Sequence, residues 1–197
     1  GIRTALNAIA RNALAEDLVV IFLSSHGSPG KADLVGEGYL VTYDTEIADL
    51  YATAFPMRDF TRDVKQRIQA QRKVVFLDTC YSGQANAEGG KGIQMVGELQ
   101  NQTAQDLCGF GSVVITSSSP HEQSWESPAL QNGYFTYFLI QALRQENGYL
   151  SIDKVFSFLQ DTVPQTVRKE KEATQTPRIM PQPLREAAEI KIGVKTN

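Results

Sequence analysis

The sequence has few of the residues that build disulfide frameworks or metal centres, since its 197 residues include two cysteines and two histidines. The two cysteines, Cys80 and Cys108, are too few for a disulfide framework. We therefore expect a reducing compartment such as the cytoplasm. Basic residues are not in excess either, because 19 Lys and Arg residues are outnumbered by 22 Asp and Glu residues. This balance indicates that nucleic acid is not a partner.

Long apolar runs are missing as well. The longest, Leu18–Leu23, is far too short to cross a bilayer, so we expect no membrane partner. A hydrophobic content of 42% and a charged content of 21% are typical of a soluble globular protein. No internal repeat or linker divides the chain, and its length fits a single domain over residues 1–197.

Short apolar runs alternate with segments of helical periodicity. The runs at 18–24 and 73–78 are continuous and rich in β-branched residues, which is typical of strands covered on both faces. Further strands are expected at 39–43, at 111–119 and near 189–194. Helices are expected at 2–15, from Pro56 with Met57, Phe60, Val64 and Ile68 inward, at 132–145 and from Ser151. Pro164 is expected to end or strain the last of these helices. This alternation predicts an α/β fold in which a mostly parallel sheet has helices on both faces.

Two of the expected strands end in residues that carry chemistry. "VVIFLSSHG" (19–27) ends at His26 and Gly27, and "VVFLDTCYSG" (74–83) contains Cys80. The carboxyl ends of parallel strands meet at one edge of the sheet, where sites usually form. A thiolate is a strong nucleophile when an imidazole lowers its pKa, and the N–H groups of Gly27 and Cys80 are candidates to bind an oxyanion. The alternative is a structural histidine and a small buried cysteine.

These motifs resemble those of the caspase–metacaspase superfamily, whose bacterial members are often called orthocaspases. His26 in "SSHG" precedes Cys80 in "DTCYSG" by 54 residues, close to the caspase spacing. The segments "SSSPHEQSWE", "GYFTYFLIQAL" and "QTPR" extend the resemblance, in order, over nearly the whole chain. It implies a caspase-like three-layer sandwich and a cysteine endopeptidase. In that enzyme Cys80 attacks the scissile carbonyl, His26 generates the thiolate and protonates the leaving amine, and the N–H groups of Gly27 and Cys80 hold the oxyanion.

The resemblance also implies which bond is cut. Metacaspases cut after Arg or Lys and use acids to bind that side chain, whereas caspases cut after Asp and use arginines. Asp78 matches the metacaspase acid, and "SWE", with Trp125 and Glu126, stands where caspases carry Ser-Trp-Arg. We therefore expect protein or peptide substrates with Arg or Lys before the scissile bond. The alternatives are a strand-end acid that caps N–H groups at Asp78 and a solvated surface acid at Glu126.

Other motif residues have weaker assignments. Ser118 and Ser119 end the third long strand, where the family pairs an extended substrate by strand addition. His121 follows a proline in a loop, so we expect a surface or substrate-edge role for it, and Cys108 is expected to be structural.

Residues 82–109 contain several glycines, many Gln and Asn residues and little periodicity, which predicts a long mobile loop. Lys91 is the only basic residue between Lys73 and Arg144, and it lies in the glycine-rich part of this segment. Extended loops are preferred sites of proteolysis, so we expect self-processing after Lys91. The alternative is a solubilising lysine in a loop.

The chain also departs from the family. The family's first two strands have no counterpart, and Gly1 begins inside the expected first helix, so we expect a processed chain or a fragment. An upstream segment or a second chain is then expected to supply the missing strands, because one edge of the sheet is otherwise left without a partner.

No cofactor is required for this chemistry. Some metacaspases bind calcium, and Asp44, Glu46 and Asp49 form a small acid cluster, but a solvated loop is the favoured interpretation of that cluster. Two other functions stay open: a catalytically silent caspase-like interaction module, and a Cys-His protease with a CHAT-like or Asp-directed specificity.

Overall fold

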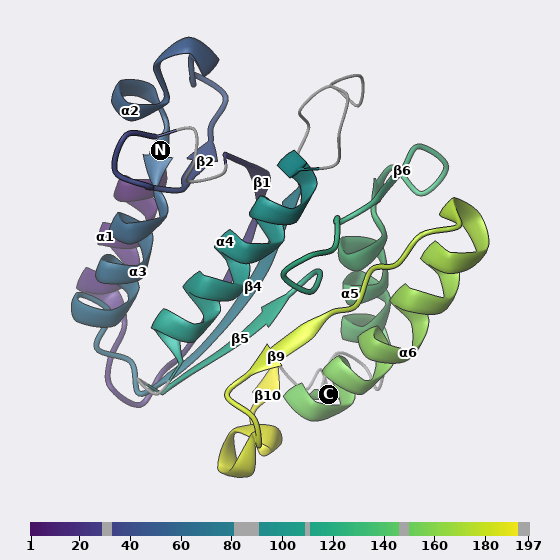
Figure 1. The fold of residues 1–197 in the computed structure, drawn as a ribbon. Coiled ribbons are helices and arrows are strands. Elements are labelled where there is room, and N and C mark those ends of the chain that lie inside the picture. The colour runs from purple at the N-terminus through teal and green to yellow at the C-terminus, as the bar shows by residue number, and fades with distance from the viewer. Residues whose placement is uncertain (29–32, 81–90, 109–110, 146–149, 193–197) are drawn as a thin grey trace.

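A six-stranded sheet forms the centre of the chain, with the strand order β3-β2-β1-β4-β5-β9 (Figure 1). The computed structural model describes residues 1–28, 33–80, 91–108, 111–145 and 150–192. The strands are β1 (Leu18–Ser28), β2 (Tyr39–Val41), β3 (Phe55–Pro56), β4 (Arg72–Cys80), β5 (Ser112–Thr116) and β9 (Arg178–Met180). The long strands at the centre are those whose continuous apolar runs predicted them.

The pairing within the sheet is mixed. The central strands β1, β4 and β5 are parallel, as predicted, and β2, β3 and β9 add to them in antiparallel directions. Strand β9 begins at Arg178 of the "QTPR" motif, and it was not predicted because three residues are too few to show a periodicity. The parallel centre places the carboxyl ends of β1 and β4 side by side.

Helices cover both faces of the sheet, which confirms the predicted three-layer, caspase-like arrangement (Figure 1). Helices α1 (Ile2–Asn12), α3 (Met57–Gln66) and α4 (Lys91–Leu107) cover one face, and α5 (Tyr134–Arg144) and α6 (Ile152–Lys171) cover the other. The alternation along β4 supplies both layers, since Val75 and Leu77 pack with the first group and Val74 and Phe76 with the second.

The predicted loop over 82–109 is wrong for residues 91–107, which form the helix α4, while 81–90 and 109–110 lie outside the described residues. The physical reason is the composition of the buried face of this helix. Gln100, Asn101 and Thr103 are buried beside Ala104 and Leu107, so three of the five buried side chains in the described part of this helix are polar. An apolar periodicity therefore could not reveal the helix.

Helix α6 also differs from expectation, because it continues through Pro164 to Lys171. Val163 and Val167 are fully buried on either side of the proline, so core packing outweighs the lost backbone hydrogen bond. The remaining elements are η2 (Ile47–Asp49), α2 (Leu50–Thr53), η4 (Arg185–Glu189) and two short antiparallel ribbons, β6 (Glu126–Ser127) with β7 (Asn132–Gly133) and β8 (Leu150–Ser151) with β10 (Lys191–Ile192). The expected last strand thus exists, but outside the main sheet.

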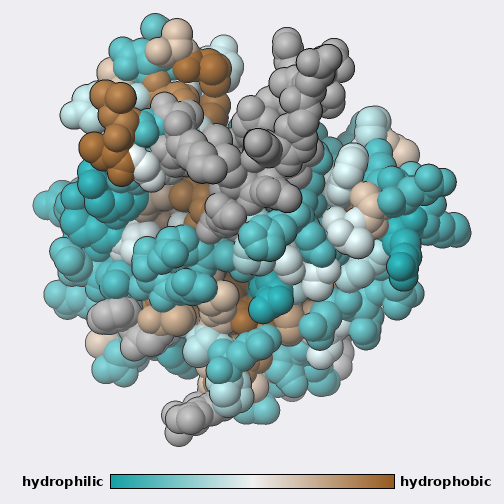
Figure 2. Space-filling view, viewed as in Figure 1, coloured by the Kyte–Doolittle hydropathy of each residue, from teal (hydrophilic) through white to brown (hydrophobic). Residues whose placement is uncertain are grey.

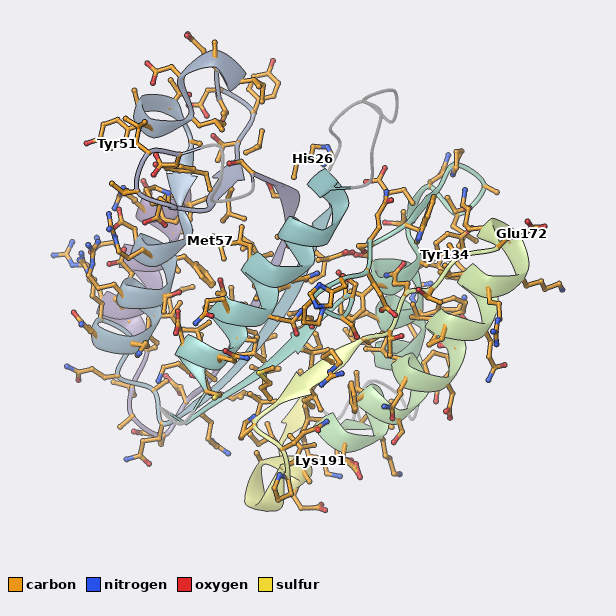
Figure 3. All side chains as sticks on the ribbon, in the orientation of Figure 1. His26, Tyr51, Met57, Tyr134, Glu172 and Lys191 are labelled. Atoms are coloured by element: carbon orange, nitrogen blue, oxygen red, sulfur yellow. The ribbon has the colours of Figure 1, made fainter. Side chains whose placement is uncertain are left out.

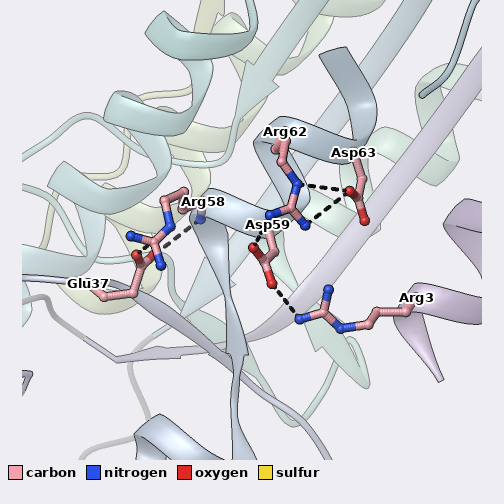
Figure 4. Close-up of polar contacts among 6 residues, drawn as sticks. All are labelled: Arg3, Glu37, Arg58, Asp59, Arg62 and Asp63. Atoms are coloured by element: carbon pink, nitrogen blue, oxygen red, sulfur yellow. Dashed lines mark hydrogen bonds and ion pairs between the residues drawn. The ribbon is translucent and has the colours of Figure 1, made fainter. Parts of the chain in front are cut away.

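An ion-pair network holds α1 and the segment before β2 onto α3 (Figure 4). Asp59 pairs with Arg3 of α1 and with Arg62, whose Nη1 lies 2.9 Å from the carboxylate. Glu37 pairs with Arg58 at 3.5 Å. Burial acts to raise the pKa of Asp59, but the hydrogen bond and charge of Arg3, with Arg62, outweigh it and hold this pKa below its usual value.

Strand β1 is only partly covered on its outer side. Within the described residues, β2 pairs with His26–Ser28 alone, so Leu18–Ser25 has no strand neighbour opposite β4. On the face of β1 that turns toward the α5–α6 layer, Val20 is 45% exposed and Phe22 is 46% exposed.

Among the helices of the described ranges, none combines the length and apolar character needed to span a membrane.

Candidate active site

The structure brings the two predicted catalytic residues together at the carboxyl edge of the sheet. His26 of β1 and Cys80 of β4 are register partners in the parallel pair, and adjacent strands lie about 4.8 Å apart. Cys80 is the last residue of β4, and its side chain lies outside the described atoms. The backbone geometry therefore places both residues at neighbouring strand ends.

The imidazole of His26 is half-buried, and its Nδ1 is a buried atom that has no hydrogen-bond partner among the described residues. Buried polar atoms are normally hydrogen-bonded, so this nitrogen is available to a hydrogen-bond partner other than the described residues. Gly27 follows in β1 opposite Leu40 of β2, and Ser25 ties the two strands together because its Oγ donates to the Val41 carbonyl at 2.5 Å. The backbone of His26 is thus fixed by strand pairing with both β2 and β4.

A cavity of about 350 Å³ lies beside His26. Its walls come from the end of β1, from β2 with the two residues after it, and from β6; the lining residues are Ser24, Ser25, His26, Val41, Thr42, Tyr43 and Glu126. The structure therefore brings the predicted Glu126 next to the predicted His26, and the described lining residues include an acid but no lysine or arginine. A basic group that enters this cavity meets one exposed carboxylate.

Asp78 occupies a different environment from Glu126. It is 2% exposed and does not line this cavity. Its carboxylate accepts hydrogen bonds from the Ser124 hydroxyl at 2.8 Å and from the Thr136 hydroxyl of α5 at 2.5 Å. Asp78 therefore links the strand that carries Cys80 to the segment that carries Glu126.

Gln175 is a buried residue that sequence reasoning missed. Its Nε2 donates to the Ser117 carbonyl at 3.0 Å and to the Ser124 hydroxyl at 3.1 Å, while its Oε1 accepts from the Trp125 N–H at 2.8 Å. The residue is fully buried, so these bonds fix the segment after β5 against the segment before β9. The only sequence signal was its place at the start of "QTPR".

The polar groups of Ser118 and Ser119 are used within the chain. Ser118 is fully buried, its hydroxyl accepts from Gln100 Nε2 at 2.7 Å, and its carbonyl accepts from Asn101 Nδ2 at 3.1 Å. The Ser119 N–H donates to Glu122 Oε2 at 3.3 Å. Pairing of an extended substrate here must replace such contacts. Trp125 is half-buried against the α5–α6 core.

Neither Lys91 nor the acid cluster is among the described residues that line the cavity beside His26. Lys91 is the first residue of α4, and its side chain is outside the described atoms. Asp44 accepts from the Thr42 hydroxyl, which lowers the pKa of Asp44, and Asp49 accepts from the Ala52 N–H at the start of α2. Across the described ranges no group of three or more His, Cys, Asp and Glu residues is placed to hold a metal ion. The preference for a solvated loop over a calcium site at this acid cluster stays a prediction.

Comparisons with known proteins agree with the resemblance in the motifs. The family model described as the caspase domain matches residues 1–188. Among solved structures, the fold is similar to a protein from Geobacter sulfurreducens, with a TM-score of 0.60 and 13% identity over 96% of this chain and 75% of that one. It is also similar to caspase-1 from Spodoptera frugiperda, with a TM-score of 0.54 and 14% identity over 91% of this chain and 66% of that one. No curated protein matches the sequence at a significant level.

Proposed function

Because the chain belongs to the caspase domain family of cysteine peptidases, we propose that it is an active cysteine endopeptidase of the metacaspase or orthocaspase type. The observation that carries the proposal is the in-register placement of His26 and Cys80 at neighbouring strand ends. His26 takes the thiol proton, and the Cys80 thiolate attacks the scissile carbonyl while the N–H groups of Gly27 and Cys80 bind the oxyanion. His26 then protonates the leaving amine, and water hydrolyses the acyl-enzyme.

The proposed specificity is for Arg or Lys before the scissile bond. Glu126 supports it, because this residue is the acid that lines the cavity beside His26. An Asp-directed pocket needs cationic walls, and the described lining of this cavity contains neither lysine nor arginine. Asp78 contributes to the specificity indirectly, since its hydrogen bond with Ser124 fixes the position of the segment that carries Glu126.

Fluorogenic peptide amides ending in Arg, Lys or Asp test both parts of the proposal. We expect release from the Arg and Lys substrates, none from Cys80→Ala, and at least a tenfold lower kcat/KM for Glu126→Gln with the basic substrates. Preference for the Asp substrate would overturn the specificity. No cleavage of any peptide, even with an upstream segment attached, would favour a catalytically silent interaction module.

We also propose that an upstream segment or a second chain pairs with the open side of β1. The support is the stretch Leu18–Ser25, where the described residues supply no second strand neighbour and Val20 and Phe22 are nearly half exposed. An added strand would hydrogen-bond this backbone, and side chains carried with it would cover the two apolar residues. A reducing cytoplasmic setting fits an enzyme whose nucleophile is a thiol.

Self-processing after Lys91 is the last part of the proposal. The Lys91–Gly92 bond lies in the first turn of α4, where N–H groups lack intrahelical acceptors and the helix frays most easily. Mass spectrometry of the wild type beside Cys80→Ala and Lys91→Ala gives the test. We expect two fragments from the wild type only, and an intact chain in all three samples would contradict self-processing.

A further inference from the structure

We propose that residues 33–53 form a docking surface for a basic, apolar segment of the protein substrate that lies beyond the scissile bond. The inference rests on the proposed peptidase function and names what a substrate carries besides its scissile residue. We call this region the acidic-apolar surface, and it consists of the exposed side chains Leu34, Val35, Tyr43, Ile47 and Tyr51 together with Asp44, Glu46 and Asp49.

The first observation is the exposure of large apolar side chains. Leu34, Val35, Tyr43, Ile47 and Tyr51 are 104%, 81%, 107%, 70% and 80% exposed. Figure 2 shows hydrophobic side chains gathered on the part of the molecule where this segment protrudes. A groove of about 400 Å³ is lined by four of them, Leu34, Val35, Ile47 and Tyr51, and by residues that include Asp33 and Asp49. Contiguous exposed apolar groups of this kind usually mark an interaction site.

The second observation is that polar side chains hold this segment in place while its apolar side chains face outward. The Asp33 carboxylate accepts from the Val35 N–H at 2.9 Å and from the hydroxyl of the buried Tyr39 at 2.8 Å. Thr53 accepts from the Glu46 N–H at 2.9 Å and donates to the Asp49 carbonyl at 2.6 Å. The apolar side chains are therefore held on an ordered turn structure. Removal of their apolar surface from water by a bound partner would stabilise the complex.

The charge of the segment identifies the partner chemistry. Residues 33–57 contain the five acids Asp33, Glu37, Asp44, Glu46 and Asp49 and no lysine or arginine. Glu37 is paired with Arg58, whereas Asp44, Glu46 and Asp49 stand exposed beside the apolar groups. A segment that combines lysine or arginine with leucine, isoleucine or aromatic side chains is complementary to both features.

The third observation is continuity with the candidate active site. Tyr43 lines the cavity that contains His26 and Glu126, and it directly precedes Asp44 of the acidic-apolar surface in the chain. Strand β2 lies beside β1 on the side away from Cys80. Because His26 protonates the leaving amine, the chain that follows the scissile bond extends toward β2. The occupant is therefore the part of the substrate on the carboxyl side of the cut.

Binding is tested first, with the Cys80→Ala protein and a fluorescein-labelled peptide of alternating lysine and leucine. We expect saturable binding, at least tenfold weaker for Leu34→Ser and for the triple variant Asp44→Asn, Glu46→Gln, Asp49→Asn. Leu14→Ser is the matched control, since Leu14 is a 59% exposed leucine outside the surface, and it should leave the Kd unchanged. Equal binding of a glutamate–leucine peptide, an unchanged Kd for Leu34→Ser, or no binding would overturn the proposal.

Cleavage is tested second, with long substrates that carry the lysine–leucine segment either after or before one scissile arginine. We expect a higher kcat/KM only when the segment follows the cut, and loss of that gain in Leu34→Ser. A short arginine amide with nothing after the cut should be hydrolysed equally by both proteins. Hydrolysis of the short amide without any gain from the segment would overturn this inference alone. No hydrolysis of the short amide would overturn the peptidase function, while the binding test still decides on the surface.

Discussion

The two sides of the sheet edge that carries the candidate active site are built in opposite ways. On the β5 side, Ser118 and Gln175 are fully buried, Asp78 is 2% exposed, and all three take part in a hydrogen-bond network. On the β1 and β2 side, Phe22 is 46% exposed and Tyr43 is fully exposed. Figure 3 shows His26 between these regions, with Tyr134 on one side and Tyr51 at the far end of the other. The β5 side is buried and hydrogen-bonded, whereas the β1 and β2 side exposes apolar side chains that a partner can cover.

Neighbouring residues of β1 give the largest expected difference. Ile21→Ala should lower the free energy of unfolding by about 3 kcal/mol, because Ile21 is buried against the α1–α3 layer, whereas Phe22→Ala should cost about 1 kcal/mol. Urea denaturation measures both values. Attachment of an upstream segment should raise the cost of Phe22→Ala toward that of Ile21→Ala, and an unchanged cost would count against pairing at β1.

On the β5 side, the substitution expected to lower stability most is at Gln175. Gln175→Ala leaves the Trp125 N–H and the Ser117 carbonyl buried without their partner, so we expect a loss of about 2 kcal/mol in the free energy of unfolding. Gln102→Ala, which removes an exposed amide of α4, is the matched control and should stay within about 0.5 kcal/mol of the wild type. Equal effects in the two variants would show that the network contributes nothing.

The acids Asp78 and Glu126 differ in burial as the two sides of the edge do, and their variants should differ in stability. Asp78→Asn should cost about 1 kcal/mol, because it weakens the acceptor of two hydroxyl donors, whereas the exposed Glu126→Gln should change stability by less than about 0.5 kcal/mol. Thermal unfolding followed by circular dichroism provides the measurement. The reverse order would mean that Glu126, and not Asp78, anchors the segment.

The ion pair at α1 gives the smallest effect and a pH dependence. Because the pKa of Asp59 is lowered in the folded chain, its contribution is present above the unfolded value of about 4 and is lost as the pH falls through the folded value. Asp59→Asn should therefore cost about 0.5 kcal/mol at pH 7 and progressively less below pH about 4. Asp161→Asn on the exposed face of α6 is the control, and a gap that widens in acid would contradict this assignment.

The sequence predicted elements whose pattern is local. Strands β1 and β4 follow from continuous β-branched runs, and α3 follows from Pro56 and the spacing of Met57, Phe60 and Val64, all of which are buried. The pairing of His26 with Cys80 could be anticipated because parallel strands share one edge. Helix α4 could not, since its buried face contains amide side chains that apolar periodicity does not count.

The environment of Asp78 was beyond sequence reasoning for a different reason. Its partners Ser124 and Thr136 lie 46 and 58 residues away in the chain. Gln175 reaches Ser117 from a similar separation of 58 residues. Such contacts depend on how β5, α5 and the segment before β9 pack together. The sequence indicated the acid, and the packing determined that Glu126 and not Asp78 faces the cavity.

The uneven pairing of β1 has a consequence for amide hydrogen exchange. Successive N–H groups of a strand point to opposite sides within the sheet. From Leu18 to Ser25 every second amide therefore bonds to β4, and the others face the side where the described part of the chain supplies no strand. Exchange along β1 should therefore alternate between slow and fast, residue by residue. The alternation ends at His26, where β2 begins to pair and both sides of the strand are occupied. The histidine thus stands at the boundary between a singly and a doubly protected stretch of one strand.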